Sequence, residues 1–231
     1  MVDQTVLDEL WDFDHPEVSE QKFAELAEDG TLPNGEREEY LTQQARALGL
    51  QKKFERADQL LDSLESPVGI VAVRQSLERG RVLNISGKAK ESIPVFKNAV
   101  ELATTAKDTF LLVDALHMLG IVDPDRGQQY QSKALDVLST ETNTRTLRWL
   151  VALHNNQGWN YYDFEKYAEA LPEFEKALEA AKKYGTPHQQ FLGEWAIGYS
   201  YKSLGRFDDA RAVQEKLATE YPNEKIPHPL V

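Results

Sequence analysis

The sequence predicts an all-α fold, a right-handed superhelical α-solenoid of about five helix pairs preceded by an N-terminal helical cap. The chain of 231 residues repeats one pattern of small and aromatic residues at offsets of about 35 to 40 residues. Apolar residues within each copy follow helical spacing. Glycines also stand inside this helical spacing, where a glycine costs about 1 kcal/mol relative to alanine. Such a cost is tolerable where two helices pack too closely for a side chain.

The two clearest copies of the pattern begin near Val151 and near Phe191. Each copy has a glycine in its first helix, an aromatic residue just past a turn, and an alanine on its second helix. These residues are Gly158, Tyr167 and Ala170 in one copy, and Gly198, Phe207 and Ala210 in the other. We expect the alanines to be the small partners of the glycines, and the aromatic residues to fill the gap beside the turn. Gly205 fits the left-handed residue that ends a helix.

Three weaker copies precede these two. Their matching residues are Ala45, Leu48, Phe54, Ala57, Leu61 and Leu64 in the first, Gly80, Leu83, Gly87, Phe96 and Ala99 in the second, and Leu119, Gly120, Tyr130 and Ala134 in the third. The turn region of the third copy is shortened. Pro124 is expected to start its second helix, with Asp123 as the cap.

The two ends of the chain lie outside the repeat. Residues 1–34 are expected to form the helical cap, because the first repeat of a solenoid otherwise exposes an apolar face. Asp14 or His15 is suited to cap a helix that starts at Pro16. The repeat domain is expected over residues 35–224, and residues 225–231 form a C-terminal tail that is expected to fray.

This pattern of glycine, aromatic and alanine residues resembles the tetratricopeptide repeat (TPR) family closely. The whole chain also looks like bacterial single-domain proteins of this class. The resemblance covers about residues 35–224. It implies a scaffold or adaptor that binds a protein or peptide in a concave groove, and it implies that the chain is not an enzyme. The family's clamp for chaperone carboxylates is disfavoured, because Leu192 and Ala196 replace two of its cations.

In such a solenoid the first helix of each pair lines the concave groove. Three arginines collect on the first helices of the first two repeats, and four aromatic residues collect on those of the last two. With one histidine and one asparagine they give the candidate partner-binding residues: Arg46, Arg74, Arg81, His117, Asn155, Trp159, Tyr162, Trp195 and Tyr199. Arginine and aromatic residues are enriched at binding hot spots. Together they suit an extended peptide with an acidic group and an apolar or proline-rich part.

The alternative is that these side chains serve the fold. Trp159 and Trp195 then fill space between neighbouring repeats. The arginines then pair with acidic residues of the same region, namely Glu39, Glu78 or Asp114. Both interpretations remain open at this point.

Composition narrows the expected partners and compartment. The chain has no cysteine, which excludes disulfides, thiolate metal sites and a cysteine nucleophile. Its net charge of −12 disfavours nucleic acid and anionic membranes, whose binding rests on Lys and Arg. No apolar run approaches a membrane span, and no secretory signal is visible, so a cytoplasmic location is expected. A homodimer stays open.

No motif for catalysis or for a cofactor or metal ion was found. The segment from Gly80 to Lys88 resembles a phosphate-binding loop only faintly, since its glycines are too far apart. No pair of histidines has the spacing of a helical metal site. A small-molecule sensor with a closed pocket formed by Trp159, Tyr162, Trp195 and His117 is the second hypothesis. An enzyme with no visible motif is the third.

Overall fold

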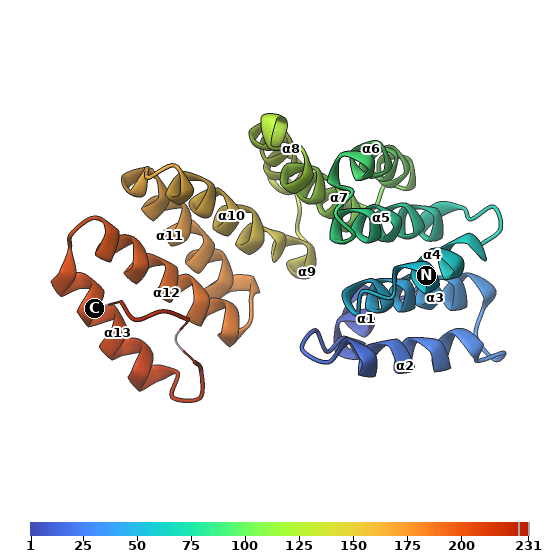
Figure 1. Cartoon of the computed structure of the whole chain (residues 1–231), viewed down its shortest axis with the longest axis horizontal. Helices are drawn as coiled ribbons and strands as arrows, with labels where there is room; N and C mark the ends of the chain where they lie inside the picture. The colour runs from blue at the N-terminus through green and yellow to red at the C-terminus, as the bar shows by residue number, and fades with distance from the viewer. Residues whose placement is uncertain (226, 231) are drawn as a thin grey trace. The chain divides into compact units, whose positions relative to one another are not determined.

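The computed structural model describes residues 1–225 and 227–230 of the chain. Over these residues the chain is helical, with no strand, and neighbouring helices pack in pairs (Figure 1). The predicted all-α class is therefore confirmed. The chain divides into two compact units, unit 1 over Met1–Ser139 and unit 2 over Thr140–Val231. The boundaries expected for the cap, repeat domain and tail remain predictions.

Unit 1 contains the cap and the first three helix pairs. Its helices are α1 (Gln4–Leu10), α2 (Pro16–Glu28), α3 (Asn34–Leu50), α4 (Phe54–Asp62), α5 (Gly69–Ile85), α6 (Ala89–Ala106), α7 (Thr109–Val122), a 3-10 helix (Pro124–Arg126) and α8 (Gly127–Leu138). Packing is most extensive between α5 and α6 and between α2 and α3, and α7 packs equally on α6 and on α8. The first helices α3 and α5 also touch each other, as do α5 and α7.

Unit 2 contains the last two helix pairs. Its helices are α9 (Thr144–Leu147), α10 (Trp149–Asp163), α11 (Tyr167–Tyr184), α12 (Pro187–Ser203) and α13 (Phe207–Glu220). The start of α12 is fixed by a capping box, in which Thr186 and Gln189 bond reciprocally to each other's backbone N–H groups. Gly205 ends α12 with a φ of 73°, as the sequence predicts.

The glycines of the first helices lie where two helices approach closely, but against a different partner from the one expected. A Cβ atom on Gly158 would lie 2.5 Å from the ring of Phe174, and one on Gly80 would lie 2.5 Å from the ring of Phe96. The small size of glycine therefore makes room for a phenylalanine of the second helix. Ala170 is buried on the same helix, but the three atoms nearest to a Cβ at Gly158 all belong to Phe174.

The residues expected beside the turns behave differently from each other. The ring of Tyr167 lies 4.8 Å from that of Tyr162, so it does pack across the turn. Phe207 is 58% exposed, so the prediction that it fills the equivalent gap is wrong. In the third copy, Pro124 starts a 3-10 helix before α8 begins, and the Asp123 side chain makes no capping bond. Asp123 instead accepts a hydrogen bond from the hydroxyl of Tyr130 at 3.2 Å.

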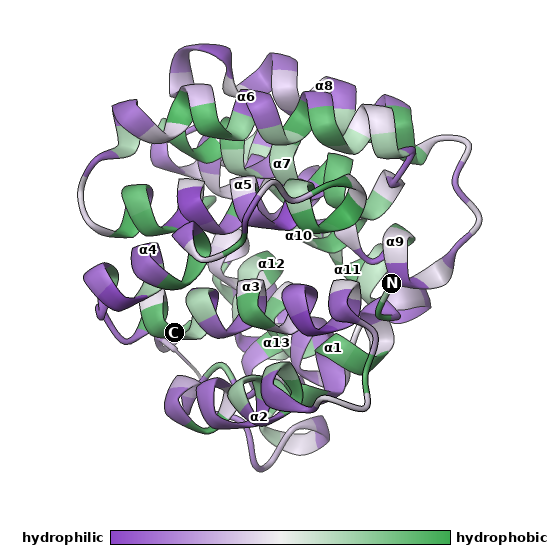
Figure 2. Cartoon of the chain, turned by 90° about the vertical axis from the view of Figure 1, so that its right-hand side faces the viewer, coloured by the Kyte–Doolittle hydropathy of each residue, from purple (hydrophilic) through white to green (hydrophobic). Residues whose placement is uncertain are grey.

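The N-terminal cap packs onto the first repeat. Leu7 of α1 and Phe23 of α2 are fully buried, and the ring of Phe23 lies 6.4 Å from that of Tyr40 on α3. His15 takes the cap position before Pro16, although its side chain makes no capping bond. Figure 2 shows hydrophobic and hydrophilic residues alternating around the helices of the chain, as packed helix pairs require.

Residues 227–230 are held by contacts with their own unit. They lie against α12 and α13 (Figure 1), and Leu230 is fully buried. The expectation of a frayed tail is therefore wrong for residues 227–230. Residues 226 and 231, which belong to the same expected tail, lie outside the described residues.

Candidate functional site

The arginines of unit 1 face carboxylates across the first helices. Arg81 on α5 donates to Oε1 of Glu78 at 2.6 Å and to Oδ1 of Asp114 on α7. Nε of Arg46 on α3 lies 4.0 Å from Oε2 of Glu78. Three adjacent first helices are thus joined by one chain of charges, which has the pairing that the alternative hypothesis described. Of these side chains only Arg46 keeps much exposed surface, at 28%.

Burial and charge act in opposite directions on this network. Burial favours the neutral form of Asp114, but the guanidinium groups of Arg81 and Arg46 outweigh it and lower the pKa of Asp114. Burial lowers the pKa of His117, one helical turn further along α7, against the opposing charge of Asp114. At neutral pH the network therefore holds an ionised Asp114 beside a neutral His117.

The N-terminal segment adds hydrogen bonds to a second buried ion pair of unit 1, between Arg74 and Glu39. Nε of Arg74 on α5 donates to Oε2 of Glu39 on α3 at 3.2 Å, and its Nη2 donates to the amide oxygen of Gln4 at 3.0 Å. The backbone N–H of Val2 donates to Oε1 of Glu39 at 3.0 Å. Burial raises the pKa of Glu39, and these partners offset part of that effect. Both oxygens of a buried carboxylate are thereby bonded.

The same segment covers Arg46. The guanidinium carbon of Arg46 lies 5.2 Å from the ring centre of Trp11 and 5.4 Å from that of Phe13. These two rings stack on each other at 4.7 Å, and Nε1 of Trp11 donates to the amide oxygen of Gln43 at 3.2 Å. Cation–π contacts of this kind hold an arginine in place without a carboxylate. We call Arg46, Arg74 and Arg81 the arginine face of unit 1. Residues 2–13 already engage Arg46 and Arg74 of this face, and Glu78 and Asp114 engage Arg81.

Unit 2 places the four predicted aromatic residues together on α10 and α12. The ring centre of Trp159 lies 5.8 Å from that of Trp195 and 6.1 Å from that of Tyr199. Tyr162 stacks on Tyr199 at 5.3 Å, and Trp195 stacks on Tyr199 at 5.1 Å. We call these four residues the aromatic face. Spacings of this size are those of interacting ring pairs.

The aromatic face is neither fully buried nor free. Trp195 belongs to the buried core, whereas Trp159, Tyr162 and Tyr199 are partly exposed. The hydroxyl groups of Tyr162 and Ser203 are hydrogen-bonded at 2.5 Å. Asn155 lies on α10 and is also partly exposed. The rings thus fill space between two repeats and also present a surface.

Residues 228–230 lie against α12 and α13, a contact that the repeat pattern does not predict. Nε1 of Trp195 donates to the backbone oxygen of His228 at 3.0 Å, and Nζ of Lys202 donates to that of Pro229 at 3.0 Å. Lys202 and Trp195 lie on the predicted first-helix face of α12. The sequence does contain one sign of this contact. The fifth repeat has Gln214 where the fourth has Phe174, so its second helix lacks a ring at that position.

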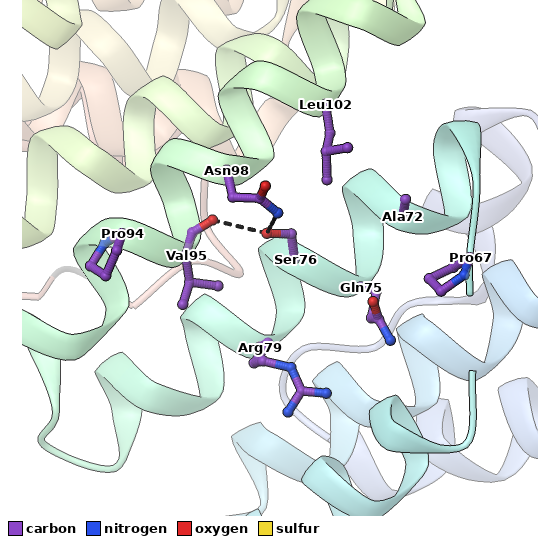
Figure 3. A pocket seen from close by; sticks show the side chains of 9 residues that line it. All are labelled: Pro67, Ala72, Gln75, Ser76, Arg79, Pro94, Val95, Asn98 and Leu102. Atoms are coloured by element: carbon purple, nitrogen blue, oxygen red, sulfur yellow. Dashed lines mark hydrogen bonds between the residues drawn. The ribbon is translucent and has the colours of Figure 1, made fainter. Parts of the chain in front are cut away.

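A separate surface pocket of about 520 Å³ lies between α5 and α6 of unit 1 (Figure 3). Its polar side chains are already bonded: Ser76 donates to the Val95 carbonyl, Asn98 donates to Ser76, and Gln75 donates to the Leu61 carbonyl. None of the predicted site residues lines it. Among the described residues no group of three or more His, Asp and Glu is placed to hold a metal ion. The described helices also include none that is long and apolar enough to cross a membrane.

Comparisons with known proteins place this fold. Residues 151–184 and 195–224 match the tetratricopeptide repeat family. No curated protein matches the sequence. BtubC from P. vanneervenii has a similar solved structure, with a TM-score of 0.68 and 16% identity over 96% of this chain and 94% of that one.

Two further solved structures are similar. RapI in its apo form gives a TM-score of 0.69 and 13% identity over 96% of this chain and 65% of that one. The TPR-like repeats of a putative kinesin light chain from Podosopora anserina give a TM-score of 0.59 and 13% identity, over 82% of this chain and 99% of that one. At these identities the likeness concerns the fold. The repeat matches and the shared fold agree with the pattern read from the sequence: residues 151–184 and 195–224 are tetratricopeptide repeats, in a chain whose fold is similar to that of solved TPR-like structures.

Proposed function

We propose that this protein is a scaffold or adaptor that binds a protein or peptide, and that the aromatic face of unit 2 is the binding surface. The observation that carries the proposal is the partial exposure of Trp159, Tyr162 and Tyr199 on two adjacent first helices. Rings held by their neighbours lose little freedom on binding, and tyrosine and tryptophan are enriched at binding hot spots. Repeat folds use extended surfaces of this kind for recognition rather than for catalysis.

The arginine face of unit 1 has a smaller part in this proposal. Arg74 and Arg81 are almost fully buried in their ion pairs, and a partner would have to replace those pairs to reach them. Arg46 is the more exposed of the three. A contact of one partner with both faces, a homodimer and a cytoplasmic location remain predictions. The small-molecule sensor also remains a prediction, and no feature of the aromatic face favours it over a peptide.

The test is selection of peptides on the full chain from a random peptide library, followed by calorimetry with variants. Trp159→Ala and Tyr199→Ala should each lower the affinity for the selected peptide by about 30-fold, corresponding to about 2 kcal/mol. Phe164→Ala is the matched control, because Phe164 is an aromatic residue of the same unit that is 78% exposed beyond the end of α10. The affinity of the Phe164→Ala variant for the peptide should stay unchanged. Equal affinity for all three variants, with helicity intact by circular dichroism, would contradict the proposal.

A further inference from the structure

In two repeats of this chain, a ring of the second helix fills the space over the first-helix glycine. Phe96 does so over Gly80, and Phe174 does so over Gly158. Both phenylalanines are fully buried. The second and fourth repeats therefore close this space with a residue of their own second helix.

The fifth repeat lacks that ring. Gln214 holds the position of Phe174, since each follows a buried alanine of the second helix by four residues. The space over Gly198 is filled instead by Leu230, whose Cδ1 would lie 2.5 Å from a Cβ placed on the glycine, and by Val213. We call this space, bounded by Gly198, Val213 and Gln214, the leucine slot. Its occupant comes from outside the repeat.

The backbone of the occupant is held at three consecutive residues. Trp195 donates to the oxygen of His228, and Lys202 donates to the oxygen of Pro229. The N–H of Leu230 donates to Oε1 of Gln214 at 2.8 Å. The polar side chain that replaces the phenylalanine thus serves as an acceptor for the incoming segment. These contacts recognise an extended backbone and one apolar side chain.

We propose that the leucine slot, with Trp195, Lys202 and Gln214, is a receptor for an extended peptide in which a leucine follows a proline. Residues 227–230 are its resident occupant, and a partner peptide of the same chemistry displaces them. This inference rests on the proposed function and names the class of its partner. The occupant lies beside the aromatic face, with the ring of His228 at 6.3 Å from Trp195 and 6.5 Å from Tyr199.

The chemistry of the segment suits exchange. Pro227 and Pro229 have no N–H groups to satisfy and restrict the chain to extended conformations, so little entropy is lost on binding. A segment joined by a short connection competes at an effective concentration in the millimolar range. A free peptide must overcome this competition, so its affinity should rise when the resident leucine is removed.

The experiment measures binding of a fluorescent peptide with the sequence of residues 226–231 to three full-length proteins. These are the natural chain, Leu230→Ala, and Leu230→Ala combined with Gln214→Phe. Fluorescence anisotropy should show binding to Leu230→Ala that is about ten-fold tighter or more than to the natural chain. Gln214→Phe should abolish this gain, because its ring closes the slot as Phe174 does in the fourth repeat. A peptide with aspartate in place of its leucine should not bind.

Thermal unfolding with and without the peptide is the second measurement, because Leu230→Ala is expected to be less stable. The peptide should raise its melting temperature, and the aspartate peptide should not. No binding and no such rise would overturn the inference. If library-selected peptides still bind through Trp159, the proposed function stands alone; if they also fail, both proposals fall. If the natural chain forms a dimer and Leu230→Ala abolishes that dimer, the slot binds a second copy of the chain, and the proposal of a separate partner peptide is overturned.

Discussion

The first-helix faces of the two units are both contacted by a segment of the chain outside the repeats, but by different means. In unit 1, residues 2–13 bond to a buried carboxylate, Glu39, and stack over Arg46. In unit 2, residues 228–230 are held through their backbone by Trp195, Lys202 and Gln214. Buried charges need their partners, since leaving one alone is costly, whereas backbone contacts can be made by many peptides. The comparison suggests that unit 1 uses its face for stability and unit 2 for recognition.

The largest expected effect tests the arginine face. Arg81→Leu leaves the buried carboxylates of Glu78 and Asp114 without their shared partner, and should lower the free energy of unfolding by about 3–5 kcal/mol. Arg79→Leu is the control on the same helix, because its partner Asp62 is exposed and its partner Asp58 is partly exposed. It should cost about 0–1 kcal/mol. If urea titrations give the two variants equal stability, the ion pairs of Arg81 do not have the stabilising role assigned to them.

A smaller effect tests a feature that the two units share. Gly80→Leu and Gly158→Leu place atoms where a phenylalanine ring already lies, and each should cost about 1–3 kcal/mol. Gly35→Ala is the control, because no atom lies within 4 Å of a Cβ at that position. It should not destabilise the chain. Denaturant titrations that show no loss for either leucine variant would mean that the helix pairs are misplaced.

The smallest effect is a pH dependence located in unit 1. The pKa of His117 is lowered from 6.5, so the unfolded chain binds a proton there before the folded chain does. Stability from the neutral histidine is present above pH 6.5 and is lost as the pH falls through the folded pKa. The loss cannot exceed about 1.4 kcal/mol per pH unit. His117→Gln should reduce the difference in unfolding free energy between about pH 7.5 and about pH 5.5. An unchanged difference in His117→Gln would refute the assignment of this pH dependence to His117.

The sequence was sufficient for the repeat and for the grouping of the site residues. Helical spacing and the glycine positions located the helix pairs, and the same register brought the aromatic face together on α10 and α12. The sequence was not sufficient to predict contacts between the repeats and the segments outside them. The bonds of Arg74 to Gln4 and of Trp195 to His228 join residues that no local pattern relates. Phe174 is the nearest neighbour of Gly158, which was not predicted because a repeat pattern gives spacing but not which side chain fills a given space.

The central claim, that recognition belongs to the aromatic face of unit 2, is tested most directly by fluorine NMR on the full chain labelled with fluorotryptophan. The chain has four tryptophans, of which the test follows three, Trp159 and Trp195 in unit 2 and Trp11 in unit 1; the fourth signal belongs to Trp149. Substitution of each tryptophan assigns its signal. Saturation with a library-selected peptide should shift the signals of Trp159 and Trp195 and leave that of Trp11 unchanged. A shift of the Trp11 signal alone, or no shift in any of the three at saturation, would contradict the claim.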